Sequence, residues 1–234
     1  MHASTLLKYL SAILGCVSLL QTTVLAETDG GAITNDSEFP IYLRVSVGPQ
    51  HRMRASDSAG TTTFKTGYVI NAALGYQMRS HHFEAEIASF NNRCKTTDPA
   101  GDAIGVERSS GNVDVDTLMA NYAYDIPLGR TPVALYLGGG VGMCRVSING
   151  LTTPSLRTLP VEWGGPVVVY AKSDWTSAYQ LRAGVTYRAN SRINLLLGYR
   201  LMKSSTLDIN LADGSTIHPD ARLHALEAAA QIRF

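Results

Sequence analysis

The chain has 234 residues, with 20 Lys or Arg, 19 Asp or Glu and a formal net charge of +1. No polybasic run accompanies this balanced composition, so the charge pattern gives no support for a nucleic-acid partner. Two of the three cysteines, Cys94 and Cys144, lie beyond the N-terminal region, and two are too few for a scaffold held together by disulfides.

The first 26 residues differ in kind from the rest. A single cation, Lys8, precedes an apolar stretch over 9–20, and small residues lead to Ala26. This layout predicts a secretory signal peptide with cleavage before Glu27. A membrane-anchor helix is the main alternative, but an apolar stretch of about 12 residues falls short of the roughly 20 needed to cross a bilayer. Lipoprotein cleavage at Cys16 is a third possibility.

From residue 41 onward, apolar and polar residues alternate with the two-residue period of β-strands. The first run is 41–48, and three hairpins with short polar turns follow at 67–90, 116–143 and 178–201. The last run, 223–234, is helical by propensity, yet its alternation matches the other strands. These runs predict eight strands, and the expected domains are a signal peptide at 1–26, a periplasmic segment at 27–40 and a barrel at 41–234.

The links between the predicted strands alternate strictly between short and long, which places all the long links at one end of an up-and-down barrel. Outer-membrane barrels have this asymmetry and an even number of strands. The expected fold is therefore all-β, an eight-stranded antiparallel up-and-down transmembrane β-barrel. The short links are predicted at 77–81, 127–131 and 188–192, and the long links at 49–63, 91–112, 147–174 and 204–220.

The two faces of the predicted strands differ in chemistry. The polar face carries four arginines and four carboxylates, which can neutralise one another inside a barrel. The apolar face carries pairs of tyrosines eight residues apart, roughly 20 Å along the axis and close to the spacing of two aromatic girdles. A soluble lipocalin-type barrel would reverse these faces. The predicted lumen charge network is Arg44, Glu84, Glu86, Asp125, Arg182, Arg200, Glu227 and Arg233, and the predicted girdle is Tyr68, Tyr76, Tyr124, Tyr179, Tyr187 and Phe234.

The same strands resemble the surface-antigen family of outer-membrane barrels from rickettsia-like bacteria, within the opacity-like and OmpA-like eight-stranded group. The resemblance rests on "GYVINAALGYQM" with "FEAEIASF", on "LMANYAYDIP" with "YLGGGVGMCRV", and on "SAYQLRAGVTYRANSRINLLLGYR". It implies a bacterial outer-membrane location in contact with lipid. It also implies assembly by the barrel assembly machinery, which reads a final strand ending in an aromatic residue, here Phe234, and a host-surface ligand for the loops.

Three sequence features invite other chemistry. The glycines at 138–142 lack the strand–loop–helix context and lysine of a nucleotide loop, and they are better explained as clearance inside a narrow barrel. His81 and His82 precede Glu84 and Glu86, but adjacent residues of a strand point to opposite faces, so a shared metal site would need a bend. A lipid-modifying enzyme would need a nucleophile near the outer rim, where Ser204, Ser205, His218 and His224 form no defensible motif. We therefore expect no catalytic, cofactor or metal site.

The expected function is a non-enzymatic outer-membrane surface protein that displays four external loops, as a surface antigen or adhesin-type scaffold. The main alternative is a porin-like channel for small solutes. Eight strands leave an interior that side chains can fill, which favours a closed barrel over a channel. The sequence leaves open whether Cys94 and Cys144 are bridged.

Overall fold

A computed structural model describes residues 40–57, 60–99, 105–154, 168–206, 209–210, 216–217 and 221–234. The predicted signal peptide at 1–26, and the predicted periplasmic segment up to residue 39, lie outside these described residues. Within them, no helix is both long and apolar enough to cross a membrane.

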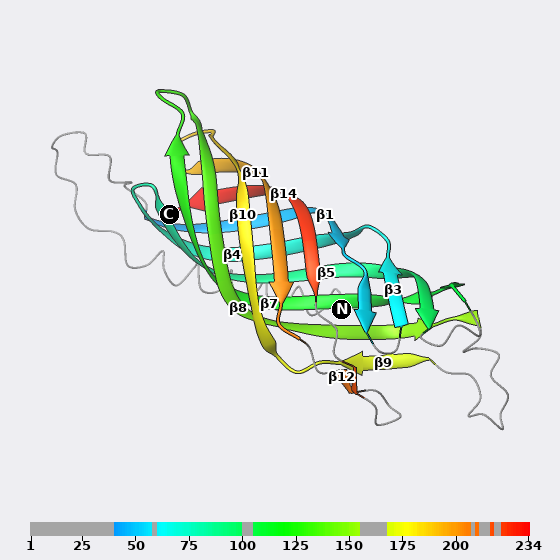
Figure 1. The fold of residues 1–234 in the computed structure, drawn as a ribbon. Helices are drawn as coiled ribbons and strands as arrows, with labels where there is room; N and C mark the ends of the chain where they lie inside the picture. Colours follow the sequence, from blue (N-terminus) through cyan, green and yellow to red (C-terminus); the bar gives the residue numbers. More distant parts are fainter. Residues whose placement is uncertain are drawn as a thin grey trace, which may run out of the picture.

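Eight antiparallel strands form a closed ring, in which β1 pairs with β4 on one side and with β14 on the other (Figure 1). The all-β, eight-stranded antiparallel barrel predicted from the sequence is therefore confirmed. Closure leaves no edge strand along the ring, so the backbone hydrogen bonds of the wall are satisfied within the barrel. The ring strands are β1 (Ile41–Arg52), β4 (Gly67–Met78), β5 (His81–Pro99), β7 (Ser110–Pro127), β8 (Val133–Thr152), β10 (Thr176–Arg188), β11 (Ile193–Ser204) and β14 (Arg222–Arg233).

Short strands extend the sheet at the end of the barrel opposite the C-terminus (Figure 1). β3 and β6 pair with β5, β2 pairs with β3, and β9 pairs with β8. A separate two-stranded sheet joins β12 to β13. Their bounds are β2 (Ala55–Asp57), β3 (Gly60–Phe64), β6 (Glu107–Arg108), β9 (Val169–Lys172), β12 (Ile209–Asn210) and β13 (Thr216–Ile217).

Tight turns join the ring strands at the other end. Arg79 has a φ of 58° between β4 and β5, and Gly129 has a φ of 64° between β7 and β8. The left-handed conformation is costly for a residue with a Cβ, such as Arg79. Two-residue hairpin turns adopt it because it matches the twist of the flanking strands.

The predicted links at 91–112, 147–174 and 49–63 are too long, because strands continue into each of them. β1 runs on to Arg52, and β2 and β3 occupy much of 49–63. β5 runs on to Pro99, β7 begins at Ser110, and β8 runs on to Thr152, so that β5, β7 and β8 have 19, 18 and 20 residues. A membrane crossing needs only 9–11 residues, so these three strands rise well beyond the bilayer on one side of the barrel.

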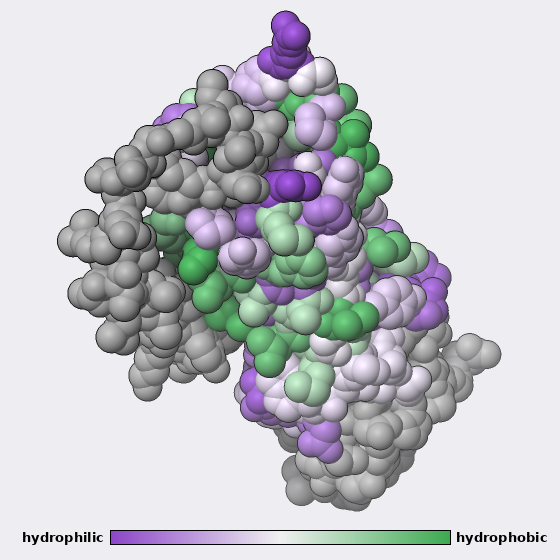
Figure 2. Space-filling view, turned by 90° about the vertical axis from the view of Figure 1, so that its left-hand side faces the viewer, coloured by the Kyte–Doolittle hydropathy of each residue, from purple (hydrophilic) through white to green (hydrophobic). Residues whose placement is uncertain are grey.

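The outward face of these three long strands changes from apolar to polar at one row. Ile87, Leu118 and Met143 point outward below it. Ser89 pairs with Asp116, and Asp116 pairs with Arg145, so the first polar outward residues lie side by side. We define these three residues as the boundary row. It marks the outer limit of the lipid-facing band, part of which shows as green patches on the wall in Figure 2.

The inward face changes in the opposite sense above the boundary row. Below it the lumen holds charged side chains, whereas above it the strands pack a hydrophobic core against one another. A wall that leaves lipid for water must turn polar outside and can then fill its interior with apolar side chains. This upper core contains Phe64, Val69, Ala88, Phe90, Cys94, Val113, Val115, Met119, Cys144, Val146, Ile148, Ala178, Met202, Ala221, Leu223 and Ala225.

Cys94 and Cys144 are both buried in the upper core as free thiols, which answers the question that the sequence leaves open about a disulfide. Cys94 lies in the part of β5 beyond the bilayer, where burial raises the pKa of its thiol to about 11. A thiol with so high a pKa stays protonated at neutral pH and is a poor nucleophile. Cys94 therefore acts as a small apolar core residue.

Candidate functional site

Six of the eight predicted lumen charges meet inside the membrane-spanning part of the barrel. β5 supplies Glu84 and Glu86 on its inward face, and four other strands supply one partner each. Each of the six is no more than 8% exposed. The ion pairs cross the lumen, so they tie β5 to the strands on the far side of the ring. The six residues of this lumen network are Arg44, Glu84, Glu86, Arg182, Arg200 and Glu227.

Glu86 is the centre of the lumen network. Its carboxylate accepts hydrogen bonds from Arg44 Nη2 at 2.8 Å, from Arg182 Nη1 at 3.3 Å and from Arg200 Nη2 at 3.0 Å. Gln180 Nε2 donates a further bond at 3.1 Å. With no exposed surface, Glu86 depends on these partners, because an isolated buried carboxylate is costly.

Two further carboxylates complete the balance of three cations against three anions. Arg44 donates to both oxygens of Glu84, at 2.9 and 2.8 Å, which is the bidentate geometry of a strong charge-assisted pair. Glu227 accepts from Arg200 Nη2 at 3.1 Å, from Ser46 at 2.9 Å and from Asn71 at 3.0 Å. The lumen network therefore carries no net charge.

The other two predicted lumen charges do not join the lumen network. Asp125 contacts His82, Oδ2 to Nε2 at 3.0 Å, and His82 Nδ1 contacts the Tyr42 hydroxyl at 3.2 Å. Arg233 is buried near the end of β14, and no ion pair links it to another side chain in the described part of the barrel. Tyr42 donates to Glu84 at 3.0 Å and so connects the His82 group to the network.

The interior leaves little open space. An inner hollow next to Arg44, His82 and Tyr136 has a volume of about 20 Å³, enough for about one water molecule. The Phe90 ring stacks against the Arg200 guanidinium, 6.0 Å from Cζ to the ring centroid, and begins the upper core above the lumen network. Charges and apolar side chains thus fill successive levels of the same lumen.

Glu84 and Glu86 lie together in the lumen network, but the other residues weighed for catalysis or metal binding do not join them in one site. His82 points into the lumen, while His81 contacts Tyr122 on the outer face at 2.8 Å. Ser204 is buried and accepts a bond from the Ala221 backbone, whereas His224 contacts Tyr199 outside. His218 lies outside the described residues, and within them no cluster of His, Cys, Asp and Glu could hold a metal ion.

Five of the six predicted girdle residues are exposed on the outward face. Tyr68, Tyr76, Tyr124, Tyr179 and Tyr187 are between 40% and 52% exposed. Phe234 is partly buried, and its backbone N–H donates to the Ile41 carbonyl at 2.9 Å, which ties the last residue to β1. Outward Phe83, Tyr122 and Tyr199 add aromatic rings that the sequence argument did not single out.

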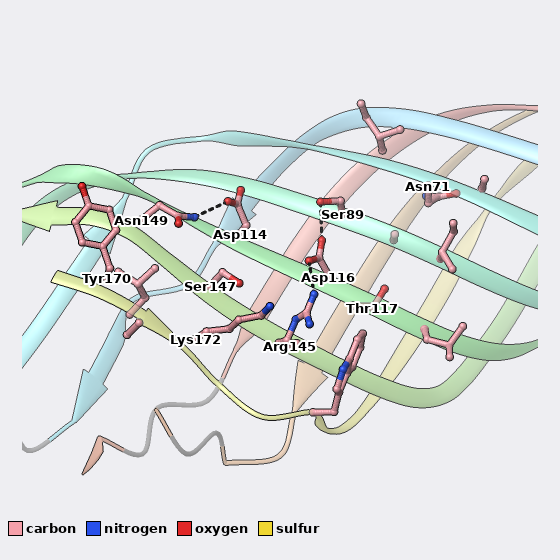
Figure 3. Close-up of a pocket in the computed structure, with 18 of the residues that line it drawn as sticks. Asn71, Ser89, Asp114, Asp116, Thr117, Arg145, Ser147, Asn149, Tyr170 and Lys172 are labelled. Carbon is pink, nitrogen blue, oxygen red and sulfur yellow. Dashed lines mark hydrogen bonds and ion pairs between the residues drawn. The ribbon is translucent and has the colours of Figure 1, made fainter. Parts of the chain in front are cut away.

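A second candidate site is a hollow of about 790 Å³ on the outer wall of the barrel. We call it the wall groove. Its polar part centres on the boundary row, where Ser89 donates to Asp116 at 3.0 Å and Arg145 lies 3.5 Å from the same carboxylate (Figure 3). Its apolar part follows the lipid-facing band below. The sequence predicts links at 91–112 and 147–174 and so does not identify this groove. Its residues nevertheless keep the two-residue spacing of a strand face, as in Asp114 and Asp116 on β7 and in Ser147 and Asn149 on β8.

Comparisons with solved structures support the fold. Neisserial surface protein A is 18% identical with a TM-score of 0.55, covering 83% of this chain and 97% of that one. The outer membrane protein OprG from Pseudomonas aeruginosa is 12% identical with a TM-score of 0.50, covering 86% of this chain and all of that one. No curated protein sequence matches the chain.

A family model described as "Outer membrane protein beta-barrel domain" matches residues 12–234. The match includes every strand of the ring, and the apolar outer band with a charged lumen is the arrangement that a barrel in lipid requires. The predicted location in the bacterial outer membrane is thereby confirmed. The chain belongs to the outer membrane protein beta-barrel domain family.

Proposed function

We propose that the protein is a non-enzymatic surface scaffold: a closed barrel that holds four external loops in place as a surface antigen or adhesin. The observation that carries this proposal is the filled lumen, in which the lumen network and the upper core occupy successive levels. A barrel that is sealed by its own side chains offers rigidity to what it holds, and loops on a rigid scaffold are where binding usually lies.

The extension of the strands at only one end of the barrel supports the same proposal. β5, β7 and β8 extend past the boundary row, whereas the opposite ends of the ring strands close in tight turns. Long connections and extended strands on one side are typical of the external end of outer-membrane barrels. One structural neighbour is itself named as a surface protein.

An epitope tag tests the display of this end. We expect a tag inserted between Ala100 and Ile104 to be labelled by antibody on intact cells, and a tag at Gly129 to be labelled only after permeabilisation. Bacteria that carry the barrel should also gain adherence to host cells, and should lose it when residues 155–167 are replaced by a Gly-Ser linker. The proposal would be contradicted if only the Gly129 tag were labelled on intact cells, or if adherence were unchanged when residues 155–167 are replaced.

The rival function, a small-solute channel, is tested by conductance. We expect the refolded protein in a planar bilayer to show no steady ion current, because paired charges and apolar side chains occupy the lumen. The triple variant Phe90→Ala, Met119→Ala, Met202→Ala truncates the upper core and should also show no steady current, because the lumen network still fills the level below it. Steady current through the unaltered protein would favour the channel.

A further inference from the structure

The wall groove joins two environments that a membrane lipid also joins. Its lower lining is apolar and faces outward at the level of the hydrocarbon, with Val45, Ala72 and Ile87 paired across β1, β4 and β5, and Leu118 next in line on β7. Its upper lining begins at the boundary row and carries the charged and polar side chains of the groove, beside the rings of Tyr170 and Trp175. Lipid headgroups lie where an outer-membrane barrel changes from apolar to polar, so the polar part of the groove stands at headgroup level.

The polar part carries charges of both signs. Arg145 and Lys172 are the cations, and Asp114 and Asp116 are the anions. Lys172 pairs with Ser147, two residues along β8 from Arg145, so both cations belong to one small area of the outer face (Figure 3). A balanced set of charges complements a headgroup that itself carries one positive and one negative group.

The two cations keep capacity for a ligand. Arg145 reaches Asp116 only at 3.5 Å, a long contact, and 27% of its side-chain surface is exposed, while Lys172 is exposed as well. The guanidinium lies over the Trp175 ring at 5.0 Å, which fixes its plane beside the groove. A held guanidinium with unused donors is suited to a phosphate, which it can bind with two parallel N–H bonds.

We propose that the wall groove binds a zwitterionic glycerophospholipid. The phosphate contacts Arg145 and Lys172, the headgroup amine faces Asp116, and one acyl chain follows the wall past Leu118 and Ala72. The two carboxylates disfavour a headgroup with several negative charges, so lipid A is the less suitable occupant. This site is separate from the loops of the proposed function and acts on the lipid around the barrel.

Native mass spectrometry of the refolded full chain in detergent tests the proposal. The probes are phosphatidylethanolamine, phosphatidylglycerol with the same acyl chains, and lipid A. We expect one phosphatidylethanolamine to be retained in preference to the other two. The double variant Arg145→Gln, Lys172→Gln should weaken its retention by about tenfold, since charged hydrogen bonds are lost. The control is Lys203→Gln, an outward cation on β11 at the other side of the ring, which should retain the lipid as the unaltered protein does.

A second variant separates lipid binding from folding. Ala72→Trp fills the apolar part of the groove without touching the cations, and it should also weaken retention while the heat-dependent shift of the folded barrel on a gel persists. Equal retention of phosphatidylethanolamine and phosphatidylglycerol, a preference for lipid A, an equal loss in Lys203→Gln, or full retention by Ala72→Trp would each overturn the proposal.

Discussion

Replacing Glu86 with Gln is expected to lower the free energy of unfolding by about 3–5 kcal/mol, because the change leaves buried arginines without their shared carboxylate. Arg44, Arg182 and Arg200 all donate to Glu86, and the guanidinium groups have almost no exposed surface. The remaining lumen network would hold three cations and two anions. Urea unfolding of the barrel in lipid vesicles, followed by tryptophan fluorescence, measures the effect.

Two further variants make the Glu86 result specific. Asp98→Asn removes an exposed carboxylate from the extension of β5 and should change stability by less than about 0.5 kcal/mol. Adding Arg200→Met to Glu86→Gln removes the excess charge, so the double variant should be less destabilised than the sum of the two single variants. A Glu86→Gln protein within about 1 kcal/mol of the unaltered barrel would show that the lumen network does not need its central carboxylate.

The sequence predicted the ring because two independent patterns agree on it. Alternation set the eight strands, and the alternation of short and long links set their up-and-down order. The terminal run was the hardest case, since Ala228, Ala229 and Ala230 favour a helix, yet β14 pairs with β1 and β11 along its length. Here pairing with two neighbours overrides local propensity.

The extended strands were missed because a single polarity rule was applied to the whole chain. Apolar outside and polar inside holds for Phe83, Glu84 and Ile87, but it reverses from Ser89 and Phe90 onward. The alternation itself continues across the boundary row. The two-residue period and the polarity of each face are thus separate signals. The period identifies the strand, and whether its outward residues are apolar or polar tells whether lipid or water surrounds it.

The contacts within the lumen were only partly accessible to sequence reasoning. The two-residue alternation along each strand identified which charged residues face the lumen. Which of them pair across the ring depends on strand register and tilt, which no local pattern encodes. Asp125 therefore meets His82 at another level of the lumen rather than an arginine of the network. Tyr42, which connects the two groups, has no charge to draw attention to it.

Placing an arginine at Leu197 is expected to cost about 2–4 kcal/mol of folding free energy and to impair assembly, because the side chain would face the hydrocarbon near mid-membrane. Leu197 is 57% exposed on the outward face of β11, where it pairs with Val185 and Ala228. The matched control is Ser147→Arg, which puts the same charge on the outward face above the boundary row. There we expect a cost of no more than about 1 kcal/mol, since water or headgroups can solvate the cation. Denaturant unfolding in vesicles measures both.

Gly198, the next residue along β11, separates polarity from crowding. It faces the lumen, where a Cβ would collide with the Tyr136 hydroxyl. Gly198→Ala should therefore impair folding although alanine is uncharged, whereas Leu197→Ala should be mild because it removes only lipid contacts. If Leu197→Arg and Ser147→Arg cost the same, the boundary row is not the edge of the bilayer. If Gly198→Ala folds as well as Leu197→Ala, side chains do not fill the lumen at that level. The two neighbouring positions thus report on opposite sides of one wall, and their different responses distinguish a membrane barrel with a packed interior from one with a solvated interior.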